Sequence, residues 1–113
     1  MQVIAQVHDS SYGKPAVGVH ARLARAFDDD WVTVAHADTD SSGRIIDWNG
    51  RHLGRGLYQI VVDTDAYFAG LGVEAGYPEV TVIFRMRSES HEFHVNLTLA
   101  PYSYTAYCGA VDT

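Results

Sequence analysis

The chain has 113 residues, of which 47% are hydrophobic and 19% charged, and its formal net charge at pH 7 is −6. A chain of this length forms one domain of ordinary size, residues 1–113, and its apolar content is typical of a folded core. The 14 acidic residues outnumber the 8 Lys and Arg, so neither nucleic acid nor an anionic membrane is expected as a partner. No apolar run approaches the roughly 20 residues that span a bilayer.

The chain contains one cysteine, Cys108, which cannot form an internal disulfide. Its first six residues lack the charged start and long apolar stretch of a signal peptide. Together these features predict a cytoplasmic protein. No HxxxH or CxxC spacing is present, so no metal site and no cofactor are expected.

Alternation of apolar and polar residues predicts β-strands along most of the chain. Near the start, Val3, Ala5 and Val7 share one face, while Gln6 and His8 share the other. The remaining runs are rich in Val, Ile, Tyr and Thr, as strands are. The predicted strands cover residues 2–9, 17–26, 31–37, 56–62, 80–86, 93–99 and 102–111.

Turn-forming residues separate these runs, at positions 10–15, 28–30, 40–43 and 49–56. One short helix is predicted over residues 65–71, with Asp63 or Thr64 as its N-cap and Gly72 at its end. Around eight short strands and one short helix predict an all-β fold, a two-sheet β-sandwich.

Two strands of this sandwich carry polar faces with histidines. Gln6 and His8 project from one strand, and His94, Asn96 and Thr98 project from another, while the opposite face of each is apolar. These faces are either solvated or covered by a second subunit, which would make them the walls of a shared cleft. The second strand has no Lys or Glu among its three polar positions, which favours the cleft.

The sequence resembles the transthyretin-like family, which includes the 5-hydroxyisourate hydrolases. The resemblance is carried by Val7-His8-Asp9, Gly13-Lys14-Pro15-Ala16, residues 39–44, Gly56-Leu57-Tyr58-Gln59-Ile60, residues 63–68 and the block from His94 to Tyr107. These segments occur in family order and spacing from about residue 3 to residue 110.

The resemblance implies a two-sheet sandwich of eight strands with a short helix after the fifth. It also implies a homotetramer assembled as a dimer of dimers, with two sites in a channel between the dimers. The first strand and the last two would form the channel walls, and these are the strands with the polar faces. The shared-cleft interpretation is therefore favoured.

Active members of the family resemble each other in a first-strand His, a turn Arg, a His in an HVP-like segment and a C-terminal Tyr-Arg-Gly-Ser. These groups are understood to activate water against a ring carbonyl of 5-hydroxyisourate. Arg44 matches the turn arginine, His94 the second histidine and Tyr107 the terminal tyrosine. Gln6 stands where the first-strand histidine is expected, and the terminal tetrapeptide reads Tyr-Cys-Gly-Ala.

The candidate catalytic residues are therefore His94 as base, Arg44 as the partner of anions and of the oxyanion, and His8 as a second imidazole. The last of these lies one pleat, about 6.6 Å, from position 6.

The candidate substrate-binding residues are Gln6, Tyr107, Asn96 and Thr98. The implied function is a cofactor-free hydrolase that opens a small cyclic amide or ureide ring, with 5-hydroxyisourate as the default substrate.

Two alternatives to this function stay open because of the departures from the family pattern. One is a diverged hydrolase or cyclase of a specialised pathway, acting on another small cyclic substrate. The other is a transthyretin-like protein that binds a planar ligand without turnover.

The other reactive or aromatic residues receive structural interpretations. Trp48 is expected to pack rather than to cover a ligand, and Cys108 is expected to be a small core residue on the same side as Tyr104 and Ala106. Of the remaining histidines, His91 is expected to be solvated. The others have no partner at metal-ligand spacing and are interpreted as surface or structural residues: His20, His36 and His52.

Overall fold

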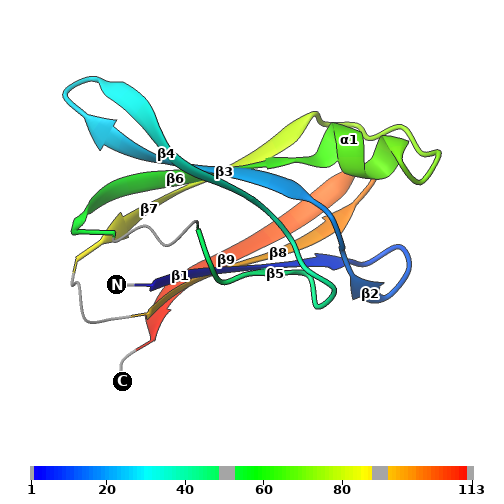
Figure 1. Ribbon diagram of the computed structural model, residues 1–113. Coiled ribbons are helices and arrows are strands. Elements are labelled where there is room, and N and C mark those ends of the chain that lie inside the picture. Colours follow the sequence, from blue (N-terminus) through cyan, green and yellow to red (C-terminus); the bar gives the residue numbers. More distant parts are fainter. Residues whose placement is uncertain (1, 49–52, 88–91, 112–113) are drawn as a thin grey trace.

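The computed structural model describes residues 2–48, 53–87 and 92–111 (Figure 1). The described chain forms nine strands and one helix. In chain order they are β1 (Gln2–Asp9), β2 (Lys14–Pro15), β3 (His20–Phe27), β4 (Asp30–Asp38), β5 (Arg44–Ile45), β6 (Gly56–Asp63), α1 (Thr64–Ala69), β7 (Glu79–Met86), β8 (Glu92–Ala100) and β9 (Ser103–Val111).

The strands form two sheets that lie one over the other (Figure 1). The first sheet has five strands, in the order β2-β1-β8-β9 with β5 also paired to β1. The second has four, in the order β4-β3-β6-β7. The fold is the predicted β-sandwich, with two additional two-residue strands: β2 lies in the predicted turn 10–15, and β5 directly follows the predicted turn 40–43.

Strands β1 and β8 pair in parallel although more than 80 residues separate them along the chain. Every other strand pair in the described chain is antiparallel. The parallel pair forms the centre of the first sheet, so it places the two predicted polar faces side by side.

The core lies between the sheets and is built from the apolar rows that the alternation predicts. On the first sheet, alternate residues of β1 and β8 are buried, whereas their polar neighbours are half-buried or exposed. The largest fully buried side chains come from both sheets and from α1, and they include Tyr58, Phe68, Leu23, Ile60, Met86 and Leu99. Burial of this apolar surface is the main stabilising term of the fold.

Strand boundaries agree with the sequence to within three residues. The largest difference is at the start of β3, which begins at His20 rather than at residue 17. Gly18 has a φ of +75°, a left-handed conformation that interrupts an extended strand and suits glycine. The two-residue turn between β3 and β4 places Asp28 at a φ of +52°, which Asp tolerates better than most residues.

Helix α1 is shorter than the predicted 65–71. The carboxylate of Asp63, its N-cap, accepts a hydrogen bond from the Ala66 amide at 3.0 Å. The helix ends at Ala69 with Gly70 as its C-cap, and the chain then turns through Gly72 at a φ of +73°. In the described part of the chain, no helix has the length and apolar character needed to cross a bilayer.

The expectation that Cys108 is a core residue is wrong. Register pairs Cys108 with the buried Val95, so it does face the side of the second sheet, but it is exposed. The neighbouring Tyr104, predicted to share its core position, has 48% of its surface exposed. The reason is that β9 is the edge strand of its sheet, where the apposed sheet does not cover it.

Candidate active site

The predicted polar faces form one continuous surface on the first sheet, on the side away from the core. Gln6 and His8 are half-buried on β1. They alternate along the strand with buried residues that face the core, among them Val7 and Asp9. On β8, His94 and Thr98 are half-buried and Asn96 is exposed. Because β1 and β8 are adjacent, all five polar side chains lie on the same face.

Strand register places four of the candidate residues in one row across the sheet. Gln6 lies opposite Arg44 of β5 on one side and opposite Asn96 of β8 on the other. Asn96 in turn lies opposite Tyr107 of β9. Directly paired residues point to the same face, so the guanidinium, two amides and a phenol follow one another along this row.

The two candidate imidazoles lie on either side of this row. His94 pairs with Ile4 and Gly109, two residues before the row, and His8 pairs with Thr98, two residues after it. Four residues of strand therefore separate His94 from His8, which corresponds to about 13 Å. Within one chain, the structure gathers Arg44, Gln6, Asn96 and Tyr107 but does not bring the two imidazoles together.

Arg44 is positioned by a tight turn that begins at Asp40. One carboxylate oxygen of Asp40 accepts hydrogen bonds from the amides of Ser42 at 2.8 Å and Arg44 at 3.0 Å. These bonds, the one from Arg44 first, hold the pKa of the Asp40 carboxyl below its usual value. The turn therefore fixes the backbone of Arg44, while its side chain stays exposed.

Gly43 lets this turn approach β1. Its φ is +76°, and a Cβ at this position would lie 2.5 Å from the Val7 carbonyl oxygen and 2.9 Å from the Pro15 Cβ. A side chain here would force the turn away from the strand. The glycine thus sets how closely Arg44 lies beside Gln6.

The side chain of Tyr107 leans toward Gly109, the residue opposite His94. Its side chain is 63% exposed, and its hydroxyl would lie 2.7 Å from a Cβ built on Gly109. Gly109 is the residue opposite His94, so the phenol occupies the space that a side chain at position 109 would take. Sequence reasoning missed this role of Gly109, although its spacing of two from Tyr107 is a visible signal.

Glu92 is a second residue that sequence reasoning missed. Its carboxylate oxygen Oε1 lies 3.9 Å from Nε2 of His94, and both side chains are about one-third exposed. The spacing of two along β8 places them on the same face. The carboxylate therefore lies beside the candidate base on the open face of the sheet.

Trp48 packs in the core, as the sequence predicts. Its side chain is 3% exposed, and its indole Nε1 donates a hydrogen bond to the Val3 carbonyl at 3.0 Å. The indole therefore anchors the segment after β5 to β1. His52 and His91 lie outside the described residues.

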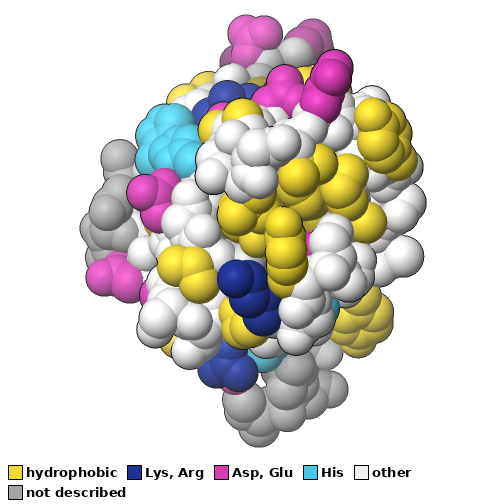
Figure 2. Space-filling model, turned by 90° about the vertical axis from the view of Figure 1, so that its right-hand side faces the viewer, with side chains coloured by type: hydrophobic (Ala, Val, Ile, Leu, Met, Phe, Trp, Pro, Cys, Tyr) yellow, Lys and Arg dark blue, Asp and Glu magenta, His cyan; other side chains and the backbone are white. Residues whose placement is uncertain are grey.

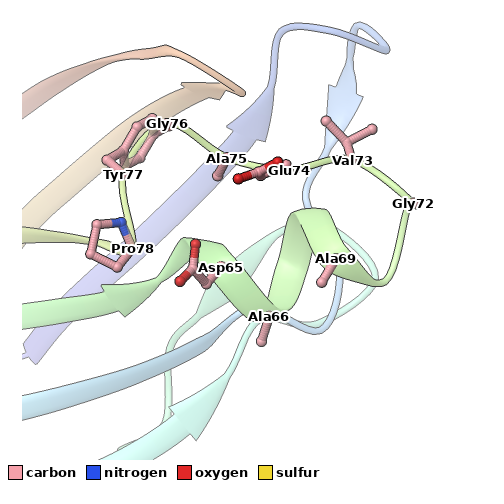
Figure 3. Close-up of a pocket in the computed structure, with 10 residues that line it drawn as sticks. All are labelled: Asp65, Ala66, Ala69, Gly72, Val73, Glu74, Ala75, Gly76, Tyr77 and Pro78. Carbon is pink, nitrogen blue, oxygen red and sulfur yellow. The ribbon is translucent and has the colours of Figure 1, made fainter.

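A hollow of about 730 Å³ lies between α1 and the segment 72–78 (Figure 3). Figure 3 shows Ala66 and Ala69 on its helical side and the chain from Gly72 to Pro78 on the other. None of the seven candidate residues lines it. The candidate site is an open sheet face, separate from this hollow. No group of three or more metal-ligating side chains is found in the described part of the chain.

Comparison with known proteins identifies the family. A family model described as the HIUase/Transthyretin family matches residues 3–109. The chain belongs to this family. It is 36% identical over 110 residues to a probable 5-hydroxyisourate hydrolase of Caenorhabditis elegans, covering 96% of this chain and 81% of the relative.

Solved structures agree with this assignment. The structure of Klebsiella pneumoniae 5-hydroxyisourate hydrolase matches with a TM-score of 0.83 and 28% identity, covering 96% of this chain and 99% of that one. Transthyretin from Sparus aurata matches with a TM-score of 0.90 over 97% of both chains, at 24% identity, and supports the fold.

Proposed function

We propose that this protein is a 5-hydroxyisourate hydrolase that opens the substrate ring with water. The observation that carries the proposal is the row of Arg44, Gln6, Asn96 and Tyr107 beside His94 on an open sheet face. It occurs in a chain whose relatives are named 5-hydroxyisourate hydrolases over almost its whole length.

In the proposed reaction, His94 removes a proton from water while the water oxygen bonds to the ring carbonyl carbon. The carbonyl oxygen gains negative charge, which the guanidinium of Arg44 stabilises. The ring C–N bond then breaks, and the nitrogen takes the proton back from His94. These reaction steps consume one water and require no metal or cofactor.

The other candidate residues bind and orient the substrate. Gln6 cannot exchange a proton near pH 7, but its amide donates and accepts hydrogen bonds with a ring carbonyl or with water. Tyr107 donates from its phenol, and Asn96 and Thr98 supply further hydrogen bonds. The carboxylate of Glu92 lies beside this base, 3.9 Å from Nε2 of His94.

We further propose that two copies of this face form the complete site, within a homotetramer that is a dimer of dimers in the cytoplasm. The separation of about 13 Å between His8 and His94 supports this arrangement, because a facing copy can bring a second imidazole near each His94. His8 then acts on substrate bound mainly by the partner subunit. An exposed face of polar groups is also suited to become the wall of a cleft.

A second candidate function is a diverged hydrolase or cyclase that acts on another small cyclic substrate, or a non-catalytic binder of a planar ligand. The observation in its favour is Gln6, which stands where active relatives of the family are expected to have a histidine. The exposed Cys108 and Ala110, in place of Arg and Ser, point the same way.

The test of the function is the decay of 5-hydroxyisourate made freshly from urate with urate oxidase and followed by ultraviolet absorbance. The proposal expects decay that accelerates in proportion to the protein concentration. Decay at the uncatalysed rate contradicts it, and calorimetric binding of 5-hydroxyisourate without acceleration of its decay identifies the binder. Light scattering tests the assembly, because a monomer at micromolar concentration contradicts a shared site.

A further inference from the structure

A group of ionisable side chains lies on the outer face of the second sheet, away from the candidate active site. His20 of β3 pairs with Asp38 of β4, and His36 precedes Asp38 by two residues on the same strand. The three side chains therefore project from the same face. Figure 2 shows one compact group of histidine side chains at the surface, next to basic and acidic side chains, besides smaller histidine areas elsewhere in the view.

Hydrogen bonds connect these three side chains in series. Nδ1 of His20 lies 2.7 Å from a carboxylate oxygen of Asp38, and Nε2 of His20 lies 3.1 Å from Nδ1 of His36. The two rings are within 18° of parallel, with centroids 5.2 Å apart. The sequence shows no partner for either histidine at metal-ligand spacing, but the pairing of β3 with β4 brings the two rings together.

This geometry is that of an oriented imidazole ligand. A ring that donates Nδ1–H to a carboxylate presents a lone pair at Nε2, an arrangement that metal-ligating histidines almost always show. Two nitrogens on adjacent positions of a metal, each at about 2.0–2.1 Å from it, lie roughly 2.9–3.4 Å apart. The observed 3.1 Å falls in this range.

The surroundings favour a cation. His20 and Arg22 border a hollow of about 420 Å³ that also contains Asp63, Asp65 and Glu79. Three carboxylates against one guanidinium leave the hollow with a net negative charge. The side chains of His20 and Asp38 are 50% and 65% exposed, which leaves room for water ligands and for small ring rotations.

We propose that His20 and His36 form a site for one divalent transition-metal ion, in which Asp38 orients His20. The ion takes the place of the hydrogen between Nε2 of His20 and Nδ1 of His36, and the displaced proton passes to water. Water completes the coordination, because the described residues hold no group of three or more metal-ligating side chains placed for one ion. The bound ion joins β3 to β4, the edge strand of its sheet.

Zinc titration of the metal-free protein by calorimetry tests the site. We expect one Zn²⁺ per chain in the wild type and loss of that binding in His20→Asn and in His36→Asn. Asp38→Asn keeps both ligands but loses the orienting carboxylate, so it should weaken binding about 10- to 100-fold. Unchanged Zn²⁺ affinity in both histidine variants would overturn the proposal.

Matched variants test three of the other histidines. His8→Asn and the double variant His52→Asn/His91→Asn should bind Zn²⁺ as the wild type does, and loss of binding in either one assigns the ion elsewhere and overturns the site. Circular dichroism without metal checks that each variant is folded. Zn²⁺ should raise the melting temperature of the wild type and not that of His36→Asn, since only the intact pair joins the strands.

Discussion

The outer faces of the two sheets differ in chemistry, although in both sheets the outward residues alternate with residues that face the same core. On the second sheet, the outward positions of the long strands include charged side chains that suit a solvated surface: Arg22, Asp38, Asp63, Glu79 and Arg85. On the first sheet, β1 and β8 present one carboxylate, Glu92, among amides, imidazoles and a hydroxyl.

This difference in charged side chains indicates which face is suited to a reaction. A solvated face gains solubility from charged side chains, whereas uncharged hydrogen-bonding groups around one guanidinium can bind a polar ring. In the first sheet the guanidinium of Arg44 lies at the end of the row. His94 lies two residues before the row along β8. The comparison therefore supports the first sheet as the reactive face, and the following variants test it.

The largest effect is expected for His94→Asn. Loss of the proposed base should lower the rate of 5-hydroxyisourate decay about a thousandfold, within the range for general acid–base catalysis. The matched variant on the other face is His20→Asn, which should keep the rate within about twofold in the presence of a chelator. Equal rates for the two variants would remove the functional difference between the faces.

The next largest effect is expected for Asp9→Ala, at the contact between the first sheet and α1. Asp9 is fully buried and its carboxylate accepts hydrogen bonds from the Tyr67 hydroxyl at 2.6 Å and the Ser11 amide at 2.8 Å. Burial and this hydrogen bond raise the pKa of Tyr67. Removal of the carboxylate leaves these donors unpaired and should lower the free energy of unfolding by about 3 kcal/mol.

Urea unfolding of the Asp9 variant measures this loss, and Tyr67→Phe is its matched control. Tyr67→Phe removes one donor and leaves the other bonds of Asp9 intact, so it should cost about half as much. A double variant shows whether the two residues act through the same bond. If Asp9→Ala unfolds at the wild-type urea midpoint, the carboxylate does not stabilise the contact between β1 and α1.

An intermediate effect is expected for Gln6→His, which places an imidazole in the row beside Arg44. If ring opening is the reaction, a second base at this position should raise kcat/KM for 5-hydroxyisourate about tenfold, with a new pKa near 6.5 in the pH profile. Gln6→Asn is the control and should give no increase. A fall in activity with His at position 6 would favour a substrate that requires the amide, and thus the diverged enzyme.

Most of the fold could be predicted from the sequence because alternation is a local signal. The seven long strands and α1 lie where the residues predict them, and the differences have local causes such as the conformation of Gly18. The exposure of Cys108 could not be predicted in this way. It depends on which strand is at the edge of the sheet, and the local pattern does not give strand order.

The candidate site could be predicted residue by residue but not as an arrangement. Alternation places Gln6 and Asn96 on polar faces, yet the parallel register between β1 and β8 joins segments about 90 residues apart. The same limit applies to the contact between His20 and His36, which lie diagonally across β3 and β4, beyond the register shift between Leu23 and Ala24.

A smaller effect is expected for Gly109→Ala, because it moves Tyr107 without removing it. The new methyl group would take the space of the Tyr107 hydroxyl, which is the free end of an exposed side chain and can shift at little cost. We expect stability close to that of the wild type and a fall in kcat/KM of about threefold. Tyr107→Phe should give a similar fall, and full activity in both variants would exclude the phenol from the site.

The smallest effect is expected for Asp40→Asn, and it should depend on pH. The pKa of Asp40 is lowered in the folded protein, so its ionised form stabilises the turn above the ordinary value of 3.8, and this contribution disappears as the pH falls through the lowered value. Thermal unfolding of wild type and variant should therefore differ slightly at pH 6 and converge in acid, below the ordinary value of 3.8. Because the turn carries Arg44, the variant should also raise KM more than it lowers kcat at pH 6.

The opposite trend in thermal unfolding, with a difference that grows in acid, would show that the Asp40 carboxylate does not hold the turn. Arg44 would then be positioned by the close approach of Gly43 to β1 alone.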